Sequence, residues 1–231
     1  MKKIILSPPF SNLFYHEAAT NIVGTYTLNK RKGLWRVLTR LKRIESGWIN
    51  DVGLRNPGIS KLKNKAYIVS ISELEDGDWS KLLDNIVGLD KLIGVEFNIS
   101  CPNLGVRQLC LDSLARANDS FDNVIVKLPH YIEDKLLYKL LDLDCILHVS
   151  NSRPTNDGAV SGSSLVFNNL KTIHRIKKLA PSKRIIAGGG IYDLQTIIDY
   201  NNVGADHFSL STALLNPNKA CSLIESAYKL F

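Results

Sequence analysis

Asparagine and cysteine side chains gather where one short apolar run of the sequence ends. Asn98, Cys101 and Asn103 follow one another closely at the end of the run 93–99. An asparagine amide offers both a donor and an acceptor, which suits a ligand with ring amides or a carboxylate. A cysteine thiolate can act as a base or a nucleophile. The same residues could instead form a turn around a small buried cysteine, and spacing alone leaves both interpretations open.

A lysine ends a second apolar run. Lys127 follows the run 124–126, and an ammonium group at the end of such a run is costly unless an anion pairs with it. We therefore predict that Lys127 faces a ligand, although its side chain could instead reach the surface. Asn151 follows a third run, whereas His148 comes before the end of that run and is expected to be a strand side chain rather than a catalyst.

Glycines and hydroxyl side chains follow the last two apolar runs. The triplet Gly188, Gly189 and Gly190 ends one run, and Ser211 and Thr212 end the next. Bare backbone N–H groups at two neighbouring strand ends, facing helix N-termini, form a common phosphate site in barrel proteins. The pattern is neither a dinucleotide-binding GxGxxG nor a P-loop.

The runs that carry these residues have the character of buried parallel strands separated by helices. They are too apolar to alternate between two faces, which is typical of strands covered on both sides. Eight such strands with helices between most of them predict an α/β protein with a trimmed (β/α)8 TIM barrel, and a doubly wound open sheet is the alternative. The expected strands are 3–7, 22–27, 66–72, 93–99, 123–128, 145–150, 184–187 and 207–211, and the expected helices are 79–87, 132–143, 165–179, 194–200 and 220–230.

Composition limits the class of protein. The 231 residues are 45% hydrophobic and 22% charged, which indicates a globular chain, and we expect one domain over 1–231. A net charge of +7 permits an anionic ligand without requiring nucleic acid. The four cysteines form no CxxC pair and the apolar start is too short for a signal peptide. We therefore expect no zinc and a cytoplasmic protein with reduced thiols.

One basic segment does not fit the plain alternation. Residues 30–43 hold seven lysines and arginines, with apolar residues spaced as on one helical face. Such a helix could contact a membrane surface or an acidic partner. It could equally be a barrel helix with a solvated basic face, which is the ordinary arrangement.

Several motifs, in their order and spacing, resemble the dihydroorotate dehydrogenases. These are FMN-binding (β/α)8 barrels that oxidise dihydroorotate to orotate in pyrimidine biosynthesis. The similar stretches include the family's signature loop, its flavin lysine strand, its asparagine turns and its two FMN phosphate loops. They are 49–56, 98–103, 126–129, 150–152, 189–191 and 211–214.

The resemblance implies a role for each matching residue. Cys101 matches the catalytic base of the soluble branch of the family. Lys127 matches the lysine beside the N1/O2 edge of FMN, where negative charge grows as the flavin is reduced. No metal is implied. The implied substrate-binding residues are Asn50, Asn98, Asn103, Asn151 and Ser152, and the implied cofactor-binding residues are Lys127, Gly162, Gly189, Gly190, Ser211 and Thr212.

Two positions depart from the family pattern. Gly24 stands where the family carries a second flavin-contacting lysine, and Ser7-Pro8-Pro9 replaces a small Ala-Ser-Gly turn against the flavin. If the backbone accepts a side chain there, Gly24→Lys is expected to strengthen the flavin site.

The expected function is FMN-dependent oxidation of dihydroorotate, in which Cys101 takes the C5 proton while the C6 hydride passes to flavin N5. The alternatives are a flavin- or phosphate-binding barrel without turnover, and a flavin oxidoreductase with another substrate. The chain begins at its first strand, without the membrane-binding extension of the family's quinone users. We therefore expect a soluble electron acceptor and no membrane partner, with a homodimer as a candidate assembly.

Overall fold

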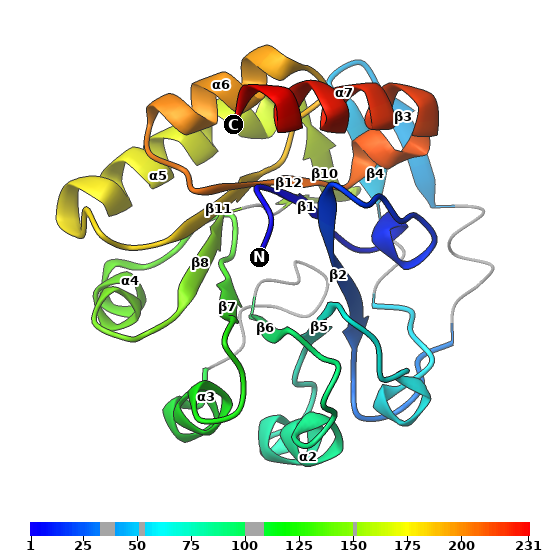
Figure 1. Ribbon diagram of the computed structural model, residues 1–231, viewed down its shortest axis with the longest axis vertical. Helices are drawn as coiled ribbons and strands as arrows, with labels where there is room; N and C mark the ends of the chain where they lie inside the picture. The colour runs from blue at the N-terminus through cyan, green and yellow to red at the C-terminus, as the bar shows by residue number, and fades with distance from the viewer. Residues whose placement is uncertain (33–39, 51–53, 100–108, 150–151) are drawn as a thin grey trace.

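The centre of the molecule is a closed barrel of eight parallel strands (Figure 1). The computed structural model describes all residues except 33–39, 51–53, 100–108 and 150–151. All eight predicted strands are present, and the barrel closes between the first two, so the predicted (β/α)8 fold is confirmed over an open sheet. The order around the barrel is β1 (Ile4–Leu6), β12 (His207–Leu210), β11 (Ile185–Gly188), β8 (Ile146–Val149), β7 (Val124–Lys127), β6 (Gly94–Asn98), β5 (Ile68–Ile71) and β2 (Ala19–Tyr26).

Helices surround most of the barrel (Figure 1). Five of the six α-helices in the described part of the chain match predicted segments. The sixth, α3, was not predicted because its buried face is small: only Ser113, Leu114 and Ala117 are buried. The helices are α2 (Asp78–Ile86), α3 (Leu111–Asn118), α4 (Asp134–Leu141), α5 (Val166–Leu179), α6 (Leu194–Asn202) and α7 (Pro217–Leu230).

The shortest connection between barrel strands is the first one. Between β1 and β2 the chain forms only the 3-10 helix η1 (Phe10–Asn12), and the described residues between β2 and β5 include η2 (Ile59–Lys61). Two further 3-10 helices, η3 (Ser163–Leu165) and η4 (Thr212–Leu215), precede α5 and α7. The shortened first connection brings the residues after β1 directly to the carboxyl ends of the barrel strands.

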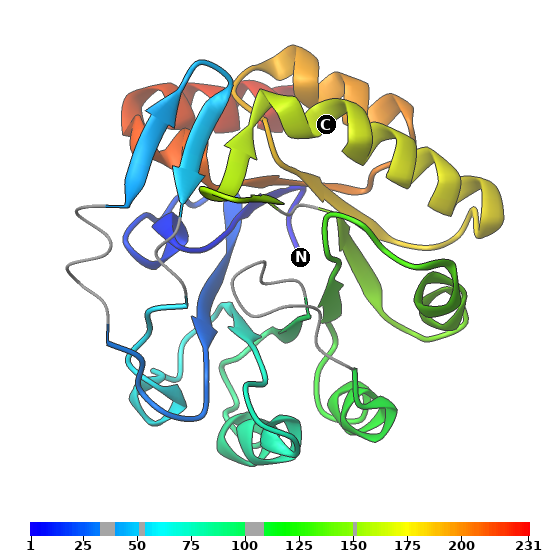
Figure 2. The same cartoon turned by 180° about the vertical axis from the view of Figure 1, so that it is seen from behind.

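A small antiparallel sheet, seen beside the barrel in Figure 2, was not predicted. Its order is β3 (Leu41–Ile44), β4 (Gly47–Asn50), β10 (Gly158–Gly162) and β9 (Arg153–Thr155). The predicted helix over 30–43 is therefore wrong at 41–43, which belong to β3, where pairing with β4 in a tight hairpin overrides the helical spacing of apolar residues. Residues 33–39 of that prediction lie outside the described chain.

The barrel interior has an apolar layer beneath a polar one. Six strands each point one isoleucine into the barrel. Because alternate residues of a strand point to the same face, the residue two positions after each of these isoleucines also points inward. In four strands that residue is Ser7, Ser70, Lys127 or His148. The apolar layer is a cluster of six buried isoleucines, Ile5, Ile22, Ile68, Ile125, Ile146 and Ile186.

The polar layer is organised around the carboxylate of Glu96. Its Oε2 lies 2.6 Å from Nδ1 of His148, and its Oε1 accepts a hydrogen bond of 2.7 Å from the Ser70 hydroxyl. Ser70 and Thr25 share a hydrogen bond of 3.0 Å, and the Asn98 amide donates to Thr25 over 2.9 Å. With the Thr25 hydroxyl donating to Ser70, every donor in this series points toward Glu96, which is the final acceptor.

Both members of the Glu96–His148 pair are completely buried. Burial raises the pKa of Glu96, but the contact with His148, the Lys127 ammonium and the hydrogen bond from Ser70 outweigh it and lower that pKa to about 2. Burial is also the largest effect on the pKa of His148 and lowers it, against the opposing influence of Glu96. An ionised Glu96 and a neutral His148 with its proton on Nδ1 follow from these surroundings.

This pair predicts a loss of stability in acid. The unfolded chain binds a proton at His148 below its ordinary pKa of 6.5, and at Glu96 below 4.5, whereas the folded chain resists both. Thermal midpoints should therefore fall as the pH drops below 6.5, and fall further between 4.5 and about 2. Glu96→Gln should cost roughly 3–5 kcal/mol near neutral pH, since it breaks a buried pair, and it should flatten the decline below pH 4.5. An unchanged pH profile in Glu96→Gln would contradict this account.

Candidate functional site

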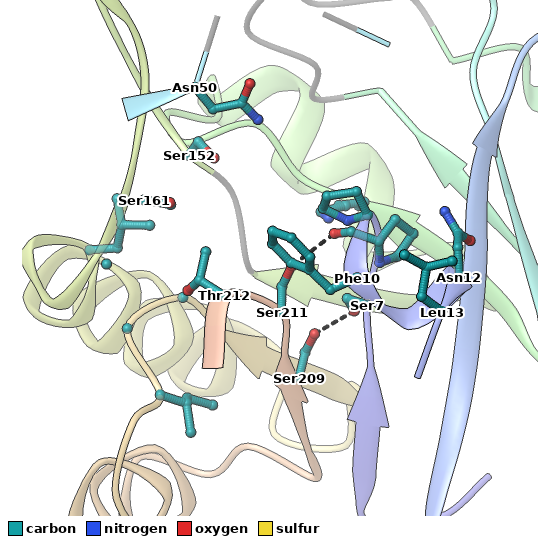
Figure 3. Close-up of a pocket in the computed structure, with 18 of the residues that line it drawn as sticks. Ser7, Phe10, Asn12, Leu13, Asn50, Ser152, Ser161, Ser209, Ser211 and Thr212 are labelled. Atoms are coloured by element: carbon teal, nitrogen blue, oxygen red, sulfur yellow. Dashed lines mark hydrogen bonds between the residues drawn. The ribbon is translucent and has the colours of Figure 1, made fainter. Parts of the chain in front are cut away.

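A pocket of 420 Å³ opens at the carboxyl ends of the barrel strands, within the size range of small-ligand sites. Its walls come from the loop after β1, from the small sheet, from Lys127 at the end of β7, and from the loops after β11 and β12. In Figure 3, Asn50, Ser152 and Ser161 lie on one side, and Phe10, Asn12 and Leu13 lie on the other. The pocket is thus placed where a barrel of this type carries its chemistry.

Most of the predicted site residues meet in this one pocket. Asn98 does not line it but lies beneath, where it is only 7% exposed and bonded to Thr25. Cys101, Asn103 and Asn151 lie outside the described residues, so their roles stay predictions. The predicted residues that line the pocket are Asn50, Lys127, Ser152, Gly162, Gly189, Gly190, Ser211 and Thr212.

Two glycines leave bare backbone at one end of the pocket. A Cβ on Gly190 would lie 2.6 Å from Val166 Cγ2 and 2.8 Å from the carbonyl oxygen of Gly162, and Gly190 has a φ of +76°. Only glycine fits this position without strain. Both glycines line the pocket, and backbone without side chains, next to the hydroxyls of Ser211 and Thr212, can approach a phosphate group closely.

Residues from two helices hold this turn in place. The Asn169 amide of α5 donates to the carbonyl of Gly188 over 2.7 Å. The Tyr200 hydroxyl of α6 reaches the carbonyls of Gly188 and Gly189 at 3.1 and 2.8 Å, and burial raises the pKa of Tyr200. Sequence reasoning missed both residues because helix side chains facing a turn carry no local signal.

The N-terminus of α6 is not open to a ligand. The carboxylate of its N-cap residue Asp193 accepts the backbone N–H of Thr196 over 2.8 Å, so the helix supplies its own anion. The residues of this region that line the pocket belong to the glycine turn and to the chain after β12. There the Thr212 hydroxyl also shares a hydrogen bond of 2.6 Å with the Tyr192 hydroxyl.

The charged side chains among the described lining residues are both cationic. They are Lys127, which is half-buried, and Arg55, which is exposed. No described carboxylate lines the pocket, so its charge favours an anionic ligand. Arg55 was not predicted as a site residue, although it follows Asn50 within the loop 49–56.

The other wall of the pocket is apolar. Pro8, Pro9, Phe10 and Leu13 line it, and the Ser7 hydroxyl beneath is bonded to that of Ser209 at 2.5 Å (Figure 3). The Ser211 hydroxyl donates to the carbonyl of Pro8 over 2.9 Å, which ties the loop after β1 to the end of β12. A wall of this kind suits the face of a planar ring.

Gly24 has no room for a side chain. The Asn12 side chain bonds both its N–H and its carbonyl at 2.9 Å. A Cβ there would lie 2.5 Å from the backbone oxygen of Ser70, with φ at +124°. The condition attached to Gly24→Lys, that the backbone accepts a side chain there, is therefore not met, and the substitution is expected to strain the backbone instead.

Other classes of site were also considered. Across the described ranges, no three histidine, cysteine or acidic side chains are placed to hold a metal. The described cysteines, Cys110, Cys145 and Cys221, carry free thiols. No helix in the described part of the chain has the length and apolar character needed to cross a membrane.

Comparison with known proteins gives relatives over most of the chain, although no protein-family model matches it. The chain is 27% identical to the dihydroorotate dehydrogenase B (NAD(+)) catalytic subunit of Bacteroides fragilis, over 83% of this chain and 74% of that protein. It is 26% identical to the same subunit of Thermotoga maritima, over 84% and 81% of the two chains. It is also 26% identical to a putative dihydroorotate dehydrogenase A (fumarate) of Streptococcus pyogenes, over 86% and 76%.

The fold also has a similar solved structure. The structure of ligand-free dihydroorotate dehydrogenase from Eimeria tenella superimposes with a TM-score of 0.75 at 17% identity, covering 97% of this chain and 82% of that one. A likeness at this identity shows a shared barrel. Together with the sequence relatives and the motifs, it confirms that the chain is related to the dihydroorotate dehydrogenase family.

Proposed function

We propose that the protein is an FMN-dependent dihydroorotate dehydrogenase that oxidises dihydroorotate to orotate. One observation carries the proposal: a single pocket gathers residues that the family resemblance assigns separately to substrate and cofactor. They come from distant parts of the chain, from Asn50 to Thr212. The pocket is also cationic, as an anionic substrate and a phosphorylated cofactor require.

The residues present fit FMN. The bare backbone at Gly162, Gly189 and Gly190, with Ser211 and Thr212, would hold its phosphate. The wall formed by Pro8, Pro9 and Phe10 would lie against the ring, with Lys127 at its edge. When bound, FMN supplies the hydride acceptor of the reaction.

The protein's own part is to orient the substrate and to move one proton. Asn50 and Ser152 at the pocket wall, together with Asn103 and Asn151, would bind the pyrimidine ring and its carboxylate. Asn98, which does not line the pocket, would instead support the polar layer through Thr25. Cys101 would act as a thiolate and take the C5 proton. The half-buried Lys127 adds a fixed positive charge, which stabilises negative charge more strongly where water is excluded.

The relatives' names point to soluble electron acceptors, since two are NAD(+)-dependent subunits and one is a fumarate enzyme. We propose that this chain likewise uses a soluble acceptor, in the cytoplasm, as one barrel domain over 1–231. Fast turnover with short-chain quinones alone would contradict the choice of acceptor. A homodimer is the assembly to test by sedimentation.

The activity is tested by anaerobic mixing of the purified yellow protein with dihydroorotate. Bleaching of the flavin and the appearance of orotate absorbance are expected. Cys101→Ala should retain FMN but reduce its flavin at least about 100-fold more slowly, the size of effect typical of a positioned base. Yellow protein that is not bleached would favour the flavin-binding barrel without turnover, to which the closed position at Gly24 already lends support. Bleaching by another compound alone would favour a different substrate.

Arg55 is predicted to bind the substrate carboxylate. It is one of two described cations of the pocket and lies in the same loop as Asn50. Charge-assisted hydrogen bonds contribute about 1.5–3 kcal/mol, and exposure of Arg55 reduces this. Arg55→Gln should therefore weaken orotate binding by about tenfold and leave FMN bound. Arg153→Gln, on the exposed strand β9, is the matched control, and equal orotate affinities in the two variants would remove Arg55 from the site.

Tyr200 is predicted to position the phosphate turn. Tyr200→Phe removes the donor to the carbonyls of Gly188 and Gly189 and should cost about 1–2 kcal/mol of stability. It should also raise the FMN dissociation constant several-fold, as measured by fluorescence quenching. Tyr228→Phe, at an exposed position of α7, should change neither quantity. FMN affinity equal to that of the starting protein would show that the turn does not depend on Tyr200.

A further inference from the structure

His148 is a buried ionisable side chain to which the proposed reaction gives no role. His148 is completely buried in β8, below the pocket, with Nδ1 bonded to Glu96. Its other ring nitrogen, Nε2, is buried and has no hydrogen-bond partner among the residues that the structure describes. Because Glu96 is ionised and can only accept, the proton of a neutral ring lies on Nδ1, and Nε2 presents a lone pair. Buried polar atoms without a partner are uncommon and indicate either strain or a function.

The charges around His148 are few and nearly balanced. Glu96 faces it from β6, and Lys127 lies level with it on β7, where the two residues are paired in the strand register. From β11, its register partner is the apolar Ile186. One carboxylate and one ammonium therefore surround a neutral ring, and the interior carries no net charge as long as the pocket beside Lys127 holds no anion.

An anion beside Lys127 would offset the positive charge of its ammonium, so that the charges around His148 would become negative in sum. The positive charge of Lys127 lowers the pKa of His148, whereas Glu96 raises it. Neutralising the field of Lys127 leaves Glu96 as the dominant charge at the ring. Even at a separation of about 10 Å and with an effective permittivity of about 20, one unit charge changes a proton affinity by more than tenfold.

We propose that His148 balances the charge of the pocket by taking up a proton when negative charge gathers beside Lys127. A hydronium ion or buffer acid gives up the proton, a new N–H bond forms at Nε2, and the imidazole becomes an imidazolium that still donates from Nδ1 to Glu96. No electrons move in this step. His148 is thus a positioning residue that acts through Lys127. That the negative charge belongs to a reduced flavin rests on the proposed function; the response of His148 does not.

The response is tested without any ligand by nuclear magnetic resonance of imidazole nitrogens. The chain has five histidines, so a protein labelled in histidine gives few signals, and His148→Gln identifies the one of interest. In the starting protein His148 should stay neutral at pH 7, with its proton on Nδ1. Lys127→Met, which removes the ammonium as a bound anion would neutralise it, should raise the proton affinity of His148 at least tenfold. Lys127→Gln serves the same purpose if the methionine variant does not fold.

The matched control is Lys183→Met. Lys183 is also a buried lysine, only 7% exposed, but its ammonium donates to the carbonyl of Leu141 near the opposite end of the barrel. Its removal should leave the titration of His148 unchanged. Equal His148 titration curves in Lys127→Met and the starting protein would overturn the proposal, as would a His148 ring already charged at pH 7.

A second measurement connects the proton to the cofactor. Reduction of the FMN-loaded protein by dithionite, in weak buffer with an indicator dye, should take up more protons near pH 7 in the starting protein than in His148→Gln. His174→Gln, an exposed histidine of α5, should match the starting protein. Equal proton uptake in His148→Gln would overturn the proposal, whereas a protein that binds no FMN would refute the proposed function and leave the Lys127→Met result to decide the role of His148.

Discussion

The buried carboxylate of Glu96 is the group on which the interior of the barrel depends. A completely buried carboxylate such as Glu96 is tolerated only when hydrogen bonds and an opposite charge offset the free energy lost by removing it from water. Here His148 and Ser70 donate to its two oxygens, and Lys127 supplies the positive field. Thr25 and Asn98 extend the same series of donors. Five strands therefore contribute to a single acceptor, and none of their inward side chains can change independently.

This polar layer explains how a tightly packed barrel can also carry a pocket. The isoleucines below it fill the barrel and exclude water, which lowers the effective permittivity around Glu96 and Lys127. Charges in such surroundings act over longer distances than at the surface. A ligand above the layer consequently meets Lys127 in a field already set by Glu96 and His148, so the chemistry of the pocket is linked to groups that do not touch the ligand.

The strands of the barrel could be predicted from the sequence because parallel strands that are covered on both sides consist of short, nearly continuous runs of apolar residues. The predicted functional residues also followed from position, since Lys127, Gly189 and Thr212 each end such a run. The small sheet could not be found in this way: β9 is fully exposed and all of β4 is only half-buried. Strands of that kind have no apolar run, and their pairing is decided by distant residues.

Pairing across the sequence also explains the errors at single residues. The helical spacing of leucines predicted a helix that reaches residue 43, but β4 is close enough to pair with 41–44 as a hairpin. At Gly24, the motifs indicated only that the family's second lysine is missing, and the contacts of Asn12 and Ser70 with the backbone show why no side chain fits there. The short connection after β1 places Asn12 there, so the length of one connection decides which side chain is possible at another point of the chain.

The closed position at Gly24 has a consequence for the charge of the pocket. With no lysine there, Lys127 is the cation that meets Glu96, and its charge is partly offset before any ligand binds. Attraction for an anionic ligand must then come from Arg55 at the mouth and from backbone N–H groups at the glycine turn. Backbone dipoles and an exposed guanidinium orient a ligand. They place less positive charge beside the ring of that ligand than a second lysine in the pocket would. In the proposed response, a proton on His148 supplies positive charge only while negative charge lies beside Lys127. The protein then avoids the permanent free-energy cost of burying another cation.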